Sequence, residues 1–139
     1  MPSDQLEGLT TQAFLTLLAG NNALTVFDGV VPDGTDPDNG YVLVYAMLNW
    51  PKDGASNALD GRSVTMVPEF NCHCVSTTAA GARAIQAQVR ATALDQRLTV
   101  AGRQSGLIYM TQALAPNRDE TTGRPVMDAV IDFSLISTP

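Results

Sequence analysis

At 139 residues, of which 45% are hydrophobic, the chain has the length and apolar content of one domain, residues 1–139, with a substantial core. A formal net charge of -6 with a single lysine, Lys52, argues against a dedicated nucleic-acid-binding protein, which neutralises phosphates with clustered Lys and Arg. No charged-then-apolar leader follows Met1, and the longest apolar run, Tyr41 to Leu48, is far below the roughly 20 residues that span a bilayer, so we expect a soluble product made in the cytoplasm.

The first forty residues predict an amphipathic helix, a short strand and a loop. The helix has Ser3 or Asp4 available as N-cap and Gly20 as its C-terminal stop. Its apolar face is formed by Leu6, Leu9, Ala13, Phe14, Leu17 and Leu18. A strand is expected at Leu24 to Phe27, and the Pro-, Asp- and Gly-rich stretch 31–40 is expected to be a loop.

Two strands separated by a long loop are predicted next. Tyr41 to Leu48 is mostly apolar with two valines and two tyrosines, which is typical of a strand covered on both faces or lying at a subunit contact. Residues 49–62 form a predicted loop of about fourteen residues, a length that is commonly functional or disordered. Val64 to Val75 is the next strand, and Pro68 inside it predicts an edge position or a bulge.

The only histidine, His73, lies between Cys72 and Cys74, and a Cys-His-Cys run raises the possibility of a metal site. In a strand both cysteines point to one face and His73 to the other, so the three cannot bind one ion or form a Cys-His nucleophilic pair. Two cysteines also suit a reducing compartment rather than a disulfide scaffold. We therefore expect core cysteines and no metal.

A second helix is predicted from an N-cap at Thr77 or Thr78 to about Leu98. The residues expected to face the sheet are Ala82, Ile85, Val89 and Ala93. The seven-residue spacing of Arg83, Arg90 and Arg97 predicts a stripe along one side of this helix. The stripe is compatible with a solvated face, with salt bridges to an acidic neighbouring subunit or, less readily, with phosphate binding.

The last part of the sequence predicts a brief strand at Leu98 to Ala101 and longer ones at Gly106 to Ala115 and Val126 to Ser137. The alternation in the last of these is typical of a half-buried antiparallel strand. Between them, Pro116 to Arg124 is expected to be a charged hairpin tip. The order of elements predicts an α+β fold, a mixed or mainly antiparallel β-sheet with two helices packed on one face.

No sequence motif for catalysis or cofactor binding is present: the sequence lacks a phosphate-binding glycine loop, H-E-x-x-H, G-x-S-x-G and paired zinc ligands. Asp128 and Asp132 are expected on the solvent face of their strand, where carboxylates serve solubility. We therefore expect a protein that is not an enzyme and needs no cofactor.

Charge is unevenly distributed, since residues 1–60 carry eight acids and one lysine while residues 61–139 carry six acids and seven arginines. The two halves either interleave in the fold or present acidic and basic faces that meet between copies in a ring.

The residue order resembles the tail terminator and tail-completion family of siphophages and related gene-transfer particles. The resemblance covers roughly residues 5–136 and is carried by the first helix ending Leu17-Leu18-Ala19-Gly20, the Val26-Phe27-Asp28-Gly29-Val30-Val31-Pro32 segment, the Gly40-Tyr41-Val42-Leu43-Val44 strand, the Phe70-Asn71-Cys72-His73-Cys74-Val75 strand and the Ala-rich second helix. Gly40 departs from the proline that is common before the tyrosine.

This resemblance implies a virion structural protein that forms a six-membered ring on the last ring of tail-tube protein. Such a ring stops tube polymerisation and joins the tail to the head connector, while DNA passes through its lumen without specific binding. Net acidity is compatible with that channel, because a negative wall repels phosphates. Three rival interpretations remain. They are a head-closure or connector ring protein of the same virion, a cytosolic ligand-binding regulatory domain and, least favoured because no nucleophile-base pair is present, an enzyme.

The residues expected to make contacts in assembly lie in the two predicted loops and on the arginine stripe. Trp50 belongs to a residue type that is enriched at interface hot spots, although it could instead close the end of its strand against the core. The candidate interaction residues are Trp50, Lys52, Asp53, Asp60, Arg62, Arg83, Arg90, Arg97, Arg118, Asp119, Glu120 and Arg124.

Overall fold

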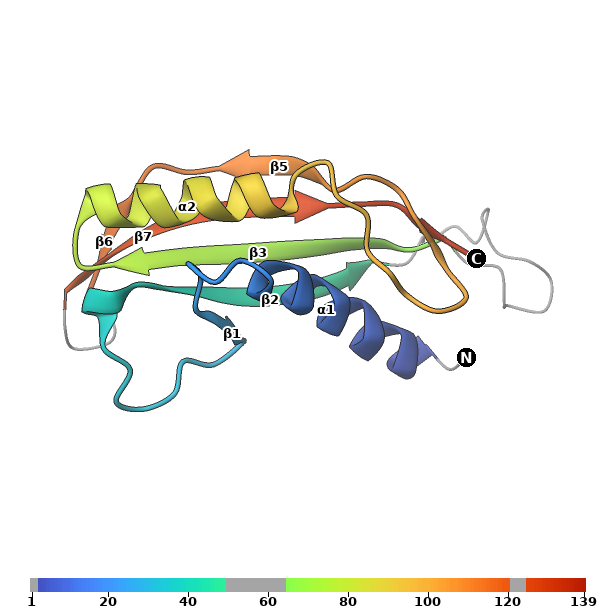
Figure 1. Cartoon of the computed structure of the whole chain (residues 1–139), viewed down its shortest axis with the longest axis horizontal. Helices are drawn as coiled ribbons and strands as arrows, with labels where there is room; N and C mark the ends of the chain where they lie inside the picture. The colour runs from blue at the N-terminus through green and yellow to red at the C-terminus, as the bar shows by residue number, and fades with distance from the viewer. Residues whose placement is uncertain (1–2, 50–64, 121–124) are drawn as a thin grey trace.

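The computed structural model describes residues 3–49, 65–120 and 125–139 (Figure 1). The helices are α1 (Ser3–Ala19), the short 3-10 helix η1 (Pro37–Asn39) and α2 (Ala79–Ala93), and the strands are β1 (Val26–Asp28), β2 (Tyr41–Asn49), β3 (Val67–Ser76), β4 (Gln104–Ser105), β5 (Tyr109–Ala113), β6 (Asn117–Asp119), β7 (Val126–Ser134) and β8 (Ser137–Thr138). Neither α-helix in the described ranges is long and apolar enough to cross a membrane.

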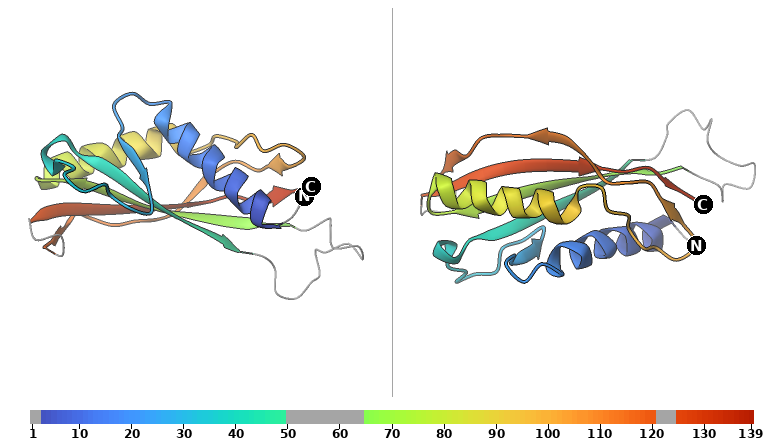
Figure 2. Two further views of the ribbon diagram at one scale, coloured as in Figure 1. Left: turned by 90° about the horizontal axis from the view of Figure 1, so that it is seen from below. Right: turned by 45° about the horizontal axis from the view of Figure 1, so that its top comes forward.

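The main sheet has six strands in the order β1-β2-β3-β7-β5, with β6 also paired to β7. Among the strands in the described residues, only the β1–β2 pair of this sheet is parallel, and its other pairs are antiparallel. Both α-helices cover the same face of this sheet, as the views in Figure 2 show. The predicted α+β fold with two helices on one face of a mainly antiparallel sheet is therefore confirmed.

Helix α1 is held to the sheet by a stack of two phenylalanine rings. Phe14 is fully buried, and its ring lies 4.0 Å from that of Phe70 on β3 with an angle of 3° between the ring planes. The predicted core face of this helix is confirmed for Leu6, Phe14 and Leu18. Leu9 is 40% exposed, so its expected place in that face was wrong.

Strand β3 lies at the centre of the sheet between β2 and β7, so the edge position predicted from Pro68 was wrong. The proline is tolerated because it is the second residue of the strand, and the β3–β7 ladder begins one residue later, at Glu69. The carbonyl of Pro68 instead accepts a hydrogen bond of 2.9 Å from the Ser134 hydroxyl. A proline near the start of a strand therefore did not distinguish an edge strand from a central one.

Helix α2 begins as predicted and ends earlier than predicted. The Thr78 side chain caps it by accepting a hydrogen bond from the Gly81 backbone N–H at 3.0 Å. It ends at Ala93 rather than near Leu98, because Asp95 adopts a φ of 63° and its N–H donates to the Ile108 carbonyl at 3.0 Å. The residues that follow, including Arg97, therefore lie outside the helix.

The strands after α2 differ from the predicted ones in their bounds. Residues 98–101 form no strand, and a two-residue strand, β4, pairs with β8 instead. The predicted strand Gly106 to Ala115 is confirmed only over β5, and the final strand is divided into β7 and β8. The predicted hairpin tip 116–124 contains a short strand, β6, paired with β7.

The sheet face opposite the helices is only partly covered. At one end, Tyr41, Val75 and Val126 form a small buried cluster against Phe27 and Val31. Further along β2, Tyr45 and Met47 on the same face are exposed. The expectation that β2 is covered on both faces therefore holds only for its first half within the described residues, and we call the uncovered part, around Tyr45, Asn71, Asp132 and Gln112, the open face.

The Phe14 stack predicts a large effect of truncation. Phe14→Ala should lower the free energy of unfolding by about 3 to 5 kcal/mol, because it removes a buried ring and leaves a cavity beside Phe70. Leu9→Ala on the same helix should change it by less than about 1 kcal/mol, since that side chain is 40% exposed and lies outside the core cluster. Urea unfolding of both variants checks the prediction, and similar effects at the two positions would contradict it.

Candidate functional site

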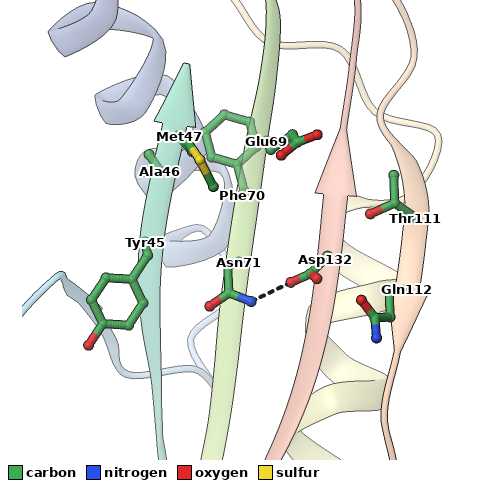
Figure 3. Close-up of a pocket in the computed structure, with 9 residues that line it drawn as sticks. All are labelled: Tyr45, Ala46, Met47, Glu69, Phe70, Asn71, Thr111, Gln112 and Asp132. Atoms are coloured by element: carbon green, nitrogen blue, oxygen red, sulfur yellow. Dashed lines mark hydrogen bonds between the residues drawn. The ribbon is translucent and has the colours of Figure 1, made fainter. Parts of the chain in front are cut away.

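The open face carries a polar row that crosses four strands. Tyr45 of β2, Asn71 of β3, Asp132 of β7 and Gln112 of β5 are successive cross-strand neighbours. Asn71 donates a hydrogen bond from Nδ2 to Asp132 Oδ1 at 2.6 Å, drawn as the dashed line in Figure 3. The row lies in a shallow depression of about 510 Å³, also lined by residues such as Met47 and Thr111.

Apolar side chains border this depression. Tyr45 is 46% exposed and Met47 58% exposed, and both lie on its β2 side in Figure 3. On the β5 side, Tyr109 is 44% exposed. A polar floor bordered by exposed aromatic and methionine side chains has the composition of a protein contact surface, because these residue types are enriched at interfaces.

His73 and Asp128 form an ion pair next to this row. The distance from His73 Nδ1 to Asp128 Oδ2 is 2.7 Å, and the two side chains are 28% and 17% exposed. The hydrogen bond that the imidazole donates to Asp128 is the largest cause that raises the pKa of His73 above its usual range, against the opposing effect of burial. Tyr45 meets the imidazole edge-on at 5.5 Å between ring centroids, which ties the pair to the open face.

The sequence predicts that the two acids of β7 are simply solvated, and the structure corrects this prediction. Asp128 and Asp132 do lie on the face away from the helices, but each is partly buried and bound to a side chain of β3. The second carboxylate oxygen of Asp128 is buried without a hydrogen-bond partner among the described residues. These carboxylates therefore organise the face rather than serve solubility alone.

The predicted orientation of the Cys-His-Cys run is confirmed. Cys72 and Cys74 are fully buried on the helix side of β3, while His73 lies on the open side. Burial is the largest cause that raises the pKa of the Cys74 thiol to about 12, and it raises the pKa of Cys72 as well. Nucleophilic attack and metal binding both need a thiolate, which these environments disfavour. Within the described ranges no group of three or more His, Cys, Asp or Glu side chains is arranged to hold a metal ion.

The predicted arginine stripe is only partly formed. Arg83 and Arg90 are exposed on α2, but Arg97 lies beyond the end of the helix, so a three-residue stripe was wrong. The Arg97 guanidinium donates to the Ser105 carbonyl at 2.7 Å. The helix ends early because backbone bonds to Ile108 replace the helical ones, which no periodicity reveals.

The remaining predicted contact residues divide into two groups. Arg118 forms an exposed ion pair with Glu120 at 2.7 Å, and Asp119 lies in β6 between them. Exposed pairs of this kind contribute little to stability. The others lie outside the described residues: Trp50, Lys52, Asp53, Asp60, Arg62 and Arg124.

The sequence interpretation missed the open face itself. Its signal was present, since Leu43, Tyr45 and Met47 alternate along β2 with the buried Val42 and Val44 and the partly buried Ala46. The apolar character of both sets concealed this alternation. Residue type alone could not show which set the helices cover.

Comparison with known proteins shows a likeness in fold. No family model and no curated protein sequence matches the chain significantly. A chain in the solved structure of a native gene transfer agent virion is similar over 96% of this chain and 98% of that chain, with a TM-score of 0.70 and 17% sequence identity. The two chains therefore share one fold over nearly all of their lengths.

The His73–Asp128 pair predicts a pH dependence of stability. Because the folded-state pKa of His73 is raised, its contribution is fully present below the unfolded value near 6.5 and is lost as pH rises through the folded pKa. His73→Gln should remove this component, on the order of 1 kcal/mol for a charge-assisted bond. Urea unfolding of both proteins from pH 5.5 to 8.5 checks the sign. A native protein that gains stability relative to His73→Gln as pH rises would contradict it.

Proposed function

We propose that the chain is a structural virion protein that caps the head-proximal end of a phage-type tail tube as a ring. In this role it stops tube polymerisation and joins the tail to the head-side connector, with DNA passing through the lumen. The observation that carries the proposal is the correspondence in fold with a chain of a gene transfer agent virion over 96% of this chain and 98% of that chain. The order of sequence motifs described above supports the finer assignment to a terminator.

Exposed apolar side chains support a role in assembly. Tyr45 and Met47 on the open face and Tyr109, Met110 and Leu114 along the β5 region are each more than 40% exposed. Grouped apolar side chains on a surface mark contact sites, because an isolated soluble domain gains nothing from hydrating them. A subunit of a ring that stacks on a tube needs such surfaces for its neighbours and for the tube.

The arrangement of reactive groups also supports the proposal of a structural role rather than an enzymatic one. Both thiols are buried and protonated on the face opposite His73. His73 is paired with Asp128, and no hydrogen bond in the described part of the chain links its ring to a hydroxyl or thiol nucleophile. We propose that this pair orders the open face and takes no part in catalysis.

The proposed function predicts a capping activity that can be seen directly. Tail tubes polymerised without the protein should have uncontrolled lengths, and tubes incubated with it should carry a ring at one end and stop growing. Negative-stain microscopy with length measurements checks this outcome. Attachment to heads alone would show a head-closure protein, and no association with either would overturn the virion role.

We assign the contact with the tube or connector to the open face. Tyr45→Ser combined with Met47→Ser should weaken capping about 10-fold or more, because it removes the two exposed side chains expected to act as anchors. Stability should change by less than about 1 kcal/mol, since neither side chain belongs to the core. Leu9→Ser on α1, which is similarly exposed, serves as the matched control. Normal capping by the double variant would move the contact elsewhere without affecting the capping role.

A further inference from the structure

Charge is segregated between the two edges of the sheet. Residues 3–49 contain six Asp or Glu residues and no Lys or Arg. These residues form α1, β1 and β2, which lie at one side of the sheet, whereas α2 and β5 lie at the other (Figure 1). The two halves of the sequence therefore do not interleave within the described structure. The uneven charge of the sequence becomes an uneven charge across the molecule.

The first of these edges is acidic and partly apolar. We define the acidic edge as β1 and the adjoining segment 28–38, which carry Asp28, Asp33, Asp36 and Asp38. Val30 in this segment is 73% exposed. Between α1 and β1 lies a groove of about 320 Å³, lined by apolar residues such as Leu15 and Val26, with Asp28 at its border. The acidic edge therefore offers an apolar recess next to carboxylates.

The orientation of α2 directs two arginines toward the opposite edge. Gln86 Nε2 donates to the carbonyls of Leu114 and Val130, at 3.0 and 2.8 Å, so this flank of the helix faces β5 and β7. Arg83 and Arg90 lie three residues before and four residues after Gln86, and helical spacing places them on the same flank. The opposite flank faces α1, where Asn21 binds Gln88 and Thr92.

Strand β5 is the last strand on this side of the sheet, and its outer side is unpaired in the described structure. All five of its residues are exposed. The exposed apolar side chains of this region are Leu107, Tyr109, Met110 and Leu114. Natural edge strands avoid association by carrying lysine or proline or by being covered, and β5 contains neither residue. We define the arginine edge as β5 with residues 107–114 and the flank of α2 that carries Arg83 and Arg90.

We infer that the acidic edge of one copy binds the arginine edge of the next copy. The two surfaces are complementary in both properties. Each has exposed apolar groups, and the negative charge of the acidic edge is opposite to the positive charge of the arginine edge. The occupant is a second copy because both complementary surfaces belong to this chain. Pairing an edge with itself about a two-fold axis would instead bring like charges together, which disfavours binding. Head-to-tail contacts between different surfaces close into a ring when the rotation allows, so the inference specifies the subunit contact of the ring proposed above, on which it rests.

Charge reversal provides the test. Arg83→Glu with Arg90→Glu, and separately Asp28→Lys with Asp33→Lys, should each weaken self-association about 100-fold or more, because each variant then faces itself with like charges. All four side chains are exposed, so both variants should keep the native circular dichroism spectrum and unfolding midpoint. Sedimentation velocity at low and high salt measures the association, and native assembly should weaken as salt rises.

Two rescues make the test specific for the contact. An equimolar mixture of the two variants should assemble, since each contact then joins opposite charges. The chain with all four substitutions, which keeps the native net charge of -6, should also assemble by itself. Assembly of either double variant like the native protein, or failure of both rescues, would overturn the inferred contact.

The outcomes also separate this inference from the proposed function. Rings that assemble through the two edges but do not cap tubes would overturn the terminator role and leave the contact standing. Rings that cap tubes and are insensitive to both charge reversals would overturn the contact alone. A native protein that stays monomeric at its highest soluble concentration and also on tail tubes would overturn both.

Discussion

The alternation of side chains along β3 is the constraint on which both faces of the molecule depend. Phe70, Cys72 and Cys74 point toward the helices and are fully buried. Asn71 and His73 point the other way and bind the carboxylates of β7. A slip of one residue in its register would turn the polar side chains of β3 toward the helices and its core side chains toward the open face, and because β3 is central it would change the pairing with both neighbours. The ordered polar row and the packed core therefore specify the same register from opposite sides.

Much of this fold could be predicted from the sequence because its longest elements have strong periodicity. Helix α1, the start of α2 and the strands β2, β3 and β7 each follow from apolar spacing and capping residues that act within a few positions of one another. The end of α2 could not be predicted in this way. Residues 94–98 contain good helix formers, but backbone bonds between Asp95, Gln96 and Ile108 draw the chain out of the helix. Such bonds depend on Ile108, which lies just before β5 and outside the local sequence pattern of the helix.

The candidate site was less predictable than the fold because it depends on the order of strands. Asp132 was identified as an outward-facing acid, but its partner Asn71 lies 61 residues away and becomes its neighbour only through the pairing of β3 with β7. The same dependence on strand order explains the wrong prediction at Pro68. A proline inside a strand favours an edge position or a bulge, but its strand is the central one of the sheet. At Gly40 the departure from the resembled family has a local reason, because its φ of 70° is closed to proline and a side chain there would meet Ile85 Cδ1 at 2.5 Å.

The burial of the two cysteines protects the protein against oxidation in a particle that has left the cell. A protein made in a reducing cytoplasm and then released in a virion, as the proposed role implies, meets oxidising surroundings that convert accessible thiolates to sulfenic acids or disulfides. Cys72 and Cys74 are protected twice, since neither is accessible to solvent and burial keeps both protonated. The core can therefore use small polarizable side chains under the helices and still keep its covalent structure during storage between hosts.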